Sequence, residues 1–255
     1  LIVVAAFLFS TCKERDKVYG EVKFETIELT KSGLEIDPDT TKSYEADVRY
    51  YKLIEAPNYL EDSVNTQTKL FLSNWLSIPK SGNFDINELL LDDMRKFYKE
   101  VDELNDLECF TCRVKNLHVR ADTLYQNNEI ISITYGWYVY EGGAHGNHGK
   151  VCYNFKKSNG EKITYKNLVI DEVRLLQIAE KAFREQNGIA DGEKIYDMFY
   201  FENETFSLND NFCFTDDSLI FYYNPYEIAP YAAGLIELIL PFKDLKGVVN
   251  FIDIK

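Results

Sequence analysis

The chain has 255 residues, of which 45% are hydrophobic and 27% are charged, so it can build one large core or two small ones. Its formal net charge is −14 at pH 7. So acidic a surface repels phosphate backbones and anionic lipid headgroups, which argues against nucleic acid as a partner and favours a basic protein or a cationic ligand. A solvated surface that only keeps the protein soluble is the plainer alternative.

The first eleven residues, LIVVAAFLFST, form an apolar run that is too short to span a bilayer and is typical of the apolar region of a secretory signal. Residues 9–12 (FSTC) are similar to a bacterial lipobox, whose cysteine becomes the lipid-carrying N-terminus. We therefore expect residues 1–17 to be a truncated lipoprotein signal and tether, held to a membrane only by acyl chains on Cys12. The alternative is a buried N-terminal strand with an incidental cysteine.

Two strands and two helices are predicted before residue 105. Residues 18–29 and 44–54 read as strands, and Pro57 opens a helix. Residues 79–82 (PKSG) end that helix, and Asp85 with Glu88 three residues later is typical of the start of a second one. Apolar residues at helical spacing mark the buried faces of the two helices: Leu60, Val64, Phe71 and Trp75 in the first, and Leu89, Leu90, Met94, Phe97 and Val101 in the second.

After residue 105 the pattern is mostly that of strands. Residues 109–124, 129–141 and 149–157 have the turn spacing of an antiparallel meander, Asp171 caps a helix, and residues 219–223 and 235–240 read as closing strands. Because strands and helices are grouped rather than alternating, we predict an α+β fold, an antiparallel sheet with packed helices. We expect one composite domain of two lobes, residues 18–105 and 106–255.

Cys109 and Cys112 have the CxxC spacing of redox or zinc sites, whereas Cys152 and Cys213 lie far from them. The sequence offers no second close cysteine pair of the kind that zinc usually requires. The segment around Cys109 and Cys112 reads as a strand, in which their side chains would point to opposite faces. We expect buried thiols or one or two disulfides, with the pairing open, rather than a metal or redox site.

Two stretches have the character of a binding surface. Residues 135–155 combine strand alternation with a double glycine and two histidines, and residues 221–241 place tyrosines around prolines and a glycine. No catalytic residue and no cofactor is predicted. Core packing of about half of these rings is the alternative, since successive strand residues face opposite sides. The candidate binding residues are Tyr140, Gly142, Gly143, His145, Asn147, Tyr223, Asn224, Tyr226 and Tyr231, and Trp137, Tyr138 and Tyr222 would widen them into an aromatic platform.

His145 and His148 lie three residues apart in a glycine-rich loop, where both could reach one metal ion. A zinc site normally takes a third protein ligand, and Glu141 is the acid that lies nearby in the sequence. We therefore predict no metal site. In this interpretation His145 hydrogen-bonds to backbone in a tight turn and His148 lies in solvent. The alternative function is a metal-assisted hydrolase that uses the His145/His148 loop and a carboxylate from elsewhere in the fold.

A family resemblance follows from these motifs. The closing segment, residues 219–234 (LIFYYNPYEIAPYAAG), and an upstream pattern resemble the bacterial envelope family called domain of unknown function 3298. Residues 48–75 resemble its usual companion, domain of unknown function 4163. The upstream pattern consists of Tyr138, Tyr140, Gly142, Gly143, Ala144, His145, Tyr153, Asn154, Phe155, Gly160, Ile163, Thr164 and Leu168.

The family includes the extracellular part of an anti-sigma factor that senses lysozyme and the non-catalytic N-terminal part of a peptidoglycan deacetylase. The resemblance therefore implies a location in the bacterial cell envelope, at the outer membrane on its periplasmic or surface face, and a recognition surface. We expect a non-catalytic lipoprotein that recognises peptidoglycan or a cationic protein such as lysozyme. The acidic charge favours the protein partner and predicts binding that weakens with salt.

Overall fold

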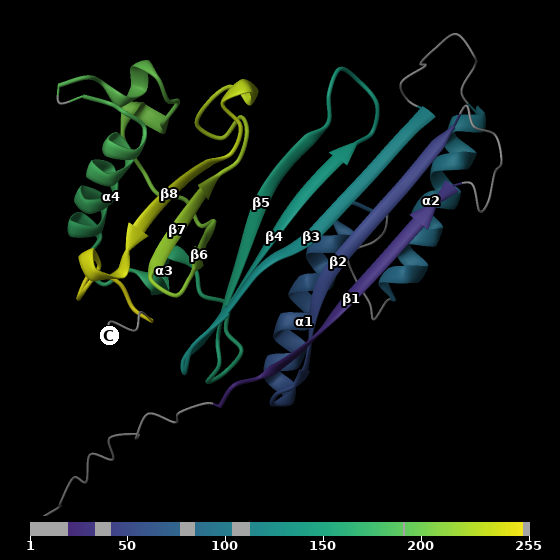
Figure 1. The fold of residues 1–255 in the computed structure, drawn as a ribbon, viewed down its shortest axis with the longest axis horizontal. Helices are drawn as coiled ribbons and strands as arrows, with labels where there is room; N and C mark the ends of the chain where they lie inside the picture. The colour runs from purple at the N-terminus through teal and green to yellow at the C-terminus, as the bar shows by residue number, and fades with distance from the viewer. Residues whose placement is uncertain (1–19, 34–41, 77–84, 104–112, 191, 252–255) are drawn as a thin grey trace, which may run out of the picture.

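The computed structural model describes residues 20–33, 42–76, 85–103, 113–190 and 192–251. It confirms the predicted α+β fold, with a five-stranded sheet, a three-stranded sheet and helices packed against both (Figure 1). Among the described helices, none is long and apolar enough to cross a membrane. The expected signal and tether, residues 1–17 with Cys12, and the pair Cys109 and Cys112 lie outside the described residues.

The larger sheet has five strands in the spatial order β1-β2-β3-β4-β5. They are β1 (Lys23–Ser32), β2 (Ser43–Glu55), β3 (Val114–Gln126), β4 (Ile130–Tyr140) and β5 (Asn147–Lys156). Neighbouring strands are antiparallel except β2 and β3, which are parallel. The expectation of an antiparallel sheet is wrong at this pair, because the chain between β2 and β3 crosses over the sheet through two helices and returns in the same direction.

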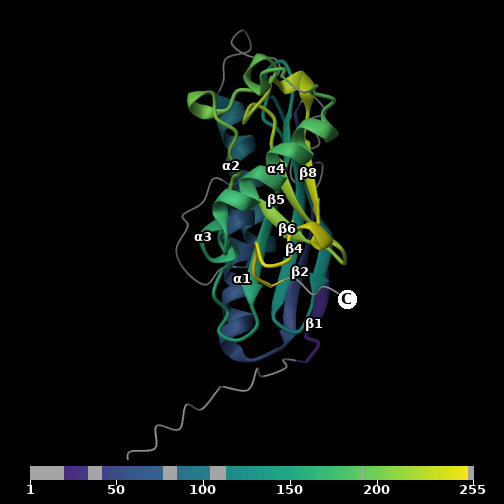
Figure 2. The ribbon, with the colours of Figure 1, turned by 90° about the vertical axis from the view of Figure 1, so that its left-hand side faces the viewer.

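Helices α1 (Asn58–Ser73) and α2 (Ile86–Glu103) cover one face of the larger sheet (Figures 1 and 2). Both predicted starts are confirmed. Pro57 is the N-cap of α1, and Asp85 Oδ1 accepts hydrogen bonds from the backbone N–H groups of Asn87 and Glu88 at the start of α2. The predicted apolar faces are buried against the sheet at Leu60, Val64, Phe71, Leu89, Leu90, Met94, Phe97 and Val101.

One hydrophobic core joins this sheet to its two helices. Val48 of β2, Val64 of α1, Leu90 of α2 and Val119 of β3 are all completely or almost completely buried in it. β3, β4 and β5, which the sequence places in the second lobe, therefore share a sheet and a core with β1 and β2. The sheet does not divide at residue 105, and the separation between the two sheets falls after β5.

The smaller sheet contains β6 (Phe212–Phe214), β7 (Ser218–Tyr223) and β8 (Ile236–Pro241), all antiparallel. Helix α4 (Glu172–Gln186) packs against β8 and begins at the predicted cap, where Asp171 accepts a hydrogen bond from the backbone N–H of Arg174. Several short elements were not predicted, because three or four residues carry no periodicity. They are β6, α3 (Tyr165–Leu168), η3 (Ile195–Asp197), η4 (Glu202–Glu204), η5 (Tyr231–Ala233) and η6 (Phe242–Asp244).

Side-chain amides join the two sheets where β5 contacts β6. Asn154 Nδ2 donates a hydrogen bond to the carbonyl of Phe212 over 2.6 Å, and Asn211 Oδ1 accepts one from the backbone N–H of Cys152 over 3.0 Å. β5 and β6 belong to separate sheets, so these amides satisfy backbone groups that a strand ladder would otherwise pair. This seam holds the β4–β5 loop and the loop after β7 at the same end of the molecule (Figure 1).

Candidate binding site

Two of the three histidines of the sequence, His118 and His148, lie in one row with Tyr138 across the larger sheet. His118 of β3, Tyr138 of β4 and His148 of β5 are direct register partners, so their side chains lie on the same face. The rings of His118 and Tyr138 are 5.9 Å apart between centroids. This is the face opposite α1 and α2, because the preceding residue of β4, Trp137, points to the helices and packs against Trp75.

The row continues into the loop after β7 through Tyr231. The ring of His148 meets Tyr231 edge-on at 5.4 Å, and the ring of His145 stacks on Tyr231 at 4.1 Å with an interplanar angle of 24°. Tyr226 packs on the same ring at 5.5 Å. We call these six residues, His118, Tyr138, His148, Tyr231, His145 and Tyr226, the ring row.

Hydrogen bonds to one carbonyl assemble the centre of the ring row. The hydroxyl of Tyr231 and Nδ1 of His145 each donate to the carbonyl of Gly146, both over 2.8 Å. Tyr231 Oη also lies 3.3 Å from Nδ1 of His148. Because a carbonyl can only accept, Nδ1 of His145 carries the proton of its hydrogen bond to Gly146. Nδ1 of each histidine is therefore engaged within the protein.

The glycine-rich loop has a backbone conformation that favours glycine. Gly142 and Gly143 have φ angles of 91° and 99°, which other residues rarely adopt. Tyr140 Oη donates to the carbonyl of Gly143 over 3.1 Å, which ties the loop to the end of β4. At Gly146 an added Cβ would lie 2.4 Å from the ring of Tyr138, so the absence of a side chain there makes room for the ring row.

Parts of the ring row are accessible to a ligand. Tyr226 is 62% exposed and Tyr138 is 36% exposed, and His145 is exposed as well. Tyr226 has a φ of 70°, which is uncommon for a residue with a side chain, and its N–H donates to the carbonyl of Ala229. An exposed aromatic side chain held in a strained backbone conformation is the kind of outlier that points to function.

The structure places the other predicted site residues differently. Tyr223 is 2% exposed and donates its hydroxyl proton to the carbonyl of Ser207, so it lies in the core and outside the ring row. Asn224 links the two sheets, because its side chain accepts from the N–H of Lys150 and donates to its carbonyl. Asn147 is exposed beside the row, and its side chain accepts a hydrogen bond from the backbone N–H of His148.

Of the three residues expected to widen the aromatic platform, Tyr138 joins the ring row and the other two do not. Trp137 lies on the helix-covered face, and Tyr222 is buried at 4% exposure near the seam. Strand alternation accounts for both, as the alternative to the platform anticipated. His148 also differs from its prediction: it is half-buried against Tyr231 rather than free in solvent. His145 does hydrogen-bond to backbone as predicted, but it stays exposed.

Sequence reasoning missed His118 as a member of the row. Its place depends on the register between β3 and β4, which sets it opposite Tyr138. The available signal was its alternation with the buried residues Leu117 and Val119, which assigns His118 to the uncovered face of a strand. Within the described part of the chain, His, Cys, Asp and Glu side chains form no group of three that could hold a metal ion.

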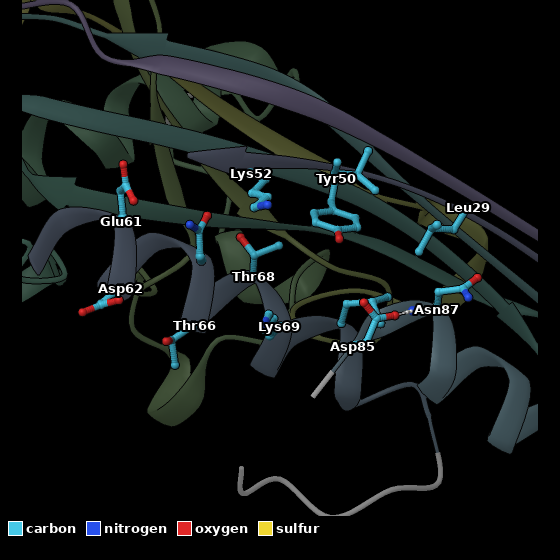
Figure 3. A pocket seen from close by; sticks show the side chains of 13 residues that line it. Leu29, Tyr50, Lys52, Glu61, Asp62, Thr66, Thr68, Lys69, Asp85 and Asn87 are labelled. Atoms are coloured by element: carbon cyan, nitrogen blue, oxygen red, sulfur yellow. Dashed lines mark hydrogen bonds between the residues drawn. The ribbon is translucent and has the colours of Figure 1, made fainter. Parts of the chain in front are cut away.

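A cavity of about 480 Å³ lies between β1, β2 and the two helices α1 and α2 (Figure 3). Several of its polar side chains are engaged within the protein. Asn65 exchanges two hydrogen bonds with the backbone of Leu53, and Glu61 accepts one from a backbone N–H. Asp62 and Thr66 extend from the side of α1 that faces away from the sheet (Figure 3). We therefore place the candidate binding site at the ring row instead.

Two family matches together cover most of the chain. Residues 166–243 match the family described as "Protein of unknown function (DUF3298)", and residues 38–148 match the family described as "Deacetylase PdaC". The resemblance predicted from the sequence motifs is confirmed by these matches. The glycine-rich loop lies in the upstream match, and Tyr226 and Tyr231 lie in the DUF3298 match. No curated protein matches the chain.

Solved structures of DUF3298 proteins share the fold. A member of the family from Bacteroides fragilis NCTC 9343 superposes with a TM-score of 0.70 at 19% identity, over 91% of this chain and 95% of that one. A DUF3298 family protein from Pseudomonas aeruginosa PAO1 gives a TM-score of 0.63 at 16% identity, over the same shares. The molecule thus shares the fold of these solved structures. Its C-terminal part is similar to DUF3298 proteins, and the upstream part is similar to PdaC.

Proposed function

We propose that the chain is a non-catalytic recognition domain of the bacterial cell envelope and that the ring row binds a cationic protein such as a lysozyme. The ring row carries the proposal, because it gathers three histidines and three tyrosines from separate segments of the chain. Rigid aromatic rings with polar tips are favoured in binding sites, and their faces attract lysine and arginine side chains. The net charge of −14 attracts the same partner from a distance.

The position of the ring row supports this role. β1 begins at the end of the larger sheet that lies opposite the β4–β5 loop (Figure 1). A lipid anchor on Cys12, as expected from the sequence, would therefore direct the ring row away from the membrane surface. The lipid anchor and the envelope location belong to the proposal, and the similarity to DUF3298 and PdaC proteins supports them.

Peptidoglycan is the second candidate partner. Its support is the exposed ring of Tyr226, since an accessible aromatic face can also pack against the apolar face of a sugar. The charge of the chain does not favour a glycan over a cationic protein, so we rank peptidoglycan second. Metal-assisted hydrolysis by His145 and His148 has less support, because in the described residues no third metal-binding side chain joins the two histidines.

The affinity of the purified chain for egg-white lysozyme tests the proposal, with sedimentation on isolated peptidoglycan as a parallel arm. The matched variants are Tyr226→Ala, in the ring row, and Tyr200→Ala, outside it, because both tyrosines are 62% exposed. We expect Tyr226→Ala to weaken lysozyme binding about 10-fold or more and Tyr200→Ala to leave it unchanged.

Raising the salt concentration from about 50 to about 500 mM should weaken the binding of lysozyme strongly. Equal effects of the two substitutions, or tight binding that ignores salt, would contradict the proposal. Binding to peptidoglycan alone, lost in Tyr226→Ala, would move the assignment to the second partner.

A further inference from the structure

Two buried thiols meet at the seam between the two sheets. Cys152 of β5 is 4% exposed and Cys213 of β6 is 1% exposed, and both are free thiols. With Tyr222 they form a small cluster of their own, separate from the two large cores. The two side chains lie in the same buried cluster, although 60 residues separate them in the chain (residues 153–212).

We propose that Cys152 and Cys213 form a disulfide bond that cross-links the two sheets. No strand ladder pairs β5 with β6 in the described chain, so the seam depends on side chains such as Asn154 and Asn211. A covalent link at this point would fix the relative position of the sheets. The cross-link is independent of the ring row and of any ligand bound there.

The surroundings of the thiols assign them different roles. Interactions with Cys152, Thr134 and Tyr222, of which that with Cys152 is the largest, outweigh burial and lower the pKa of the Cys213 thiol to about 7. Burial, together with its interaction with Cys213, raises the pKa of Cys152. Cys213 is therefore the thiol that ionises first, and the thiolate is the nucleophile in thiol–disulfide exchange.

The exchange requires an oxidant that carries a disulfide, such as a thiol oxidoreductase or oxidised glutathione. The Cys213 thiolate attacks one sulfur of that disulfide, forms a mixed disulfide and expels the first thiolate. Cys152 then loses its proton and attacks Sγ of Cys213, which expels the second thiolate. The pair has lost two protons and two electrons, and the oxidant has become two thiols. Because both cysteines are buried, the reaction proceeds when the seam opens transiently.

The test equilibrates the full chain with oxidised or reduced glutathione and maps the disulfides of unreduced peptides by mass spectrometry. We expect a cross-linked pair of peptides that contains Cys152 and Cys213. The closed loop is long, so the oxidised chain should unfold about 5–15 °C higher than the reduced chain. Cys213→Ser should abolish this shift, and the control Cys109→Ser/Cys112→Ser should keep it.

If Cys213→Ser fails to fold, the peptide map of the unsubstituted chain decides alone. The oxidation is repeated in urea just below the unfolding transition, where the seam opens more often. Absence of the Cys152–Cys213 peptide under both conditions would overturn the proposal. A cross-linked chain that unfolds at the same temperature as the reduced chain would also overturn it, since the bond would then place no constraint on the two sheets.

Discussion

The hydroxyl of Tyr231 donates a hydrogen bond to the carbonyl of Gly146, which lies 85 residues earlier in the chain, over 2.8 Å. The bond joins the loop after β7 to the β4–β5 loop, so each sheet contributes to the ring row. Nδ1 of His145 donates to the same carbonyl. Gly146 is therefore the point at which the two halves of the candidate site are held together.

Tyr231→Phe tests this junction, because it keeps the ring and removes the hydroxyl. The variant loses its bond to Gly146 and its contact with Nδ1 of His148, so we expect a stability loss of about 1 kcal/mol. Amide hydrogen exchange in residues 141–148 should also become faster. Tyr140→Phe is the control, since its bond to Gly143 stays within one loop. Unchanged exchange in Tyr231→Phe would show that the hydroxyl does not hold the two loops together.

Gly149→Ala tests the contact between the sheets beside the ring row. A Cβ at Gly149 would lie 2.3 Å from Oδ1 of Asn224 and 2.8 Å from the ring of Trp137. We expect a loss of about 1–3 kcal/mol in the free energy of unfolding, measured by chemical denaturation. Gly136→Ala on β4 is the matched control, because nothing lies within 4 Å of its added Cβ. Equal stability of the two variants would refute the close approach of Asn224.

Lys115→Ala tests the buried ion pair between β3 and α2. Nζ of Lys115 lies 3.0 Å from Asp93, and the two side chains are 7% and 1% exposed. The substitution leaves the Asp93 carboxylate buried without its cation, which should cost about 3–5 kcal/mol. Lys181→Ala, from an exposed pair with Glu185, should cost less than about 0.5 kcal/mol. Chemical denaturation of both variants checks this, and similar losses would contradict it.

The stability that the ion pair of Lys115 and Asp93 contributes depends on pH. Burial lowers the pKa of Lys115, but the charge and hydrogen bond of Asp93 and those of Glu141 outweigh it, so the pKa is raised above its ordinary value of 10.5. A raised lysine pKa contributes stability that is complete below 10.5 and is lost as the pH rises through the folded-state pKa. Lys115 therefore keeps its full contribution to stability from pH 7 to about pH 10. The difference in unfolding free energy between wild type and Lys115→Met should stay constant over that range. A decline across that range would contradict the direction of the shift.

Much of the fold could be predicted from the sequence because its long elements carry strong patterns. The starts of α1, α2 and α4 follow from Pro57, Asp85 and Asp171, and their apolar faces follow from helical spacing. The parallel pairing of β2 with β3 could not be read, since it depends on where the crossover returns. β6 has three residues, which is too few for alternation to show.

The candidate site could be predicted only in part. The glycines and His145 stand out locally, because positive φ needs glycine and the loop is short. Tyr223 and Tyr226 look alike in the sequence, but β7 ends at Tyr223, which points into the core, and the turn that follows turns Tyr226 outward. His118 enters the row only through strand register, which a single sequence does not reveal.

Hydrogen exchange of the full chain, with and without a saturating amount of egg-white lysozyme, tests the central claim most directly, because it locates the bound surface. The account predicts slower exchange on binding in two segments, residues 136–150 and 224–234, which carry most of the ring row. It predicts no change along α4 and its loop to η3, residues 172–195. Protection centred on α4, or on the cavity between α1 and β2, would contradict the account, as would no change in exchange anywhere at saturating lysozyme.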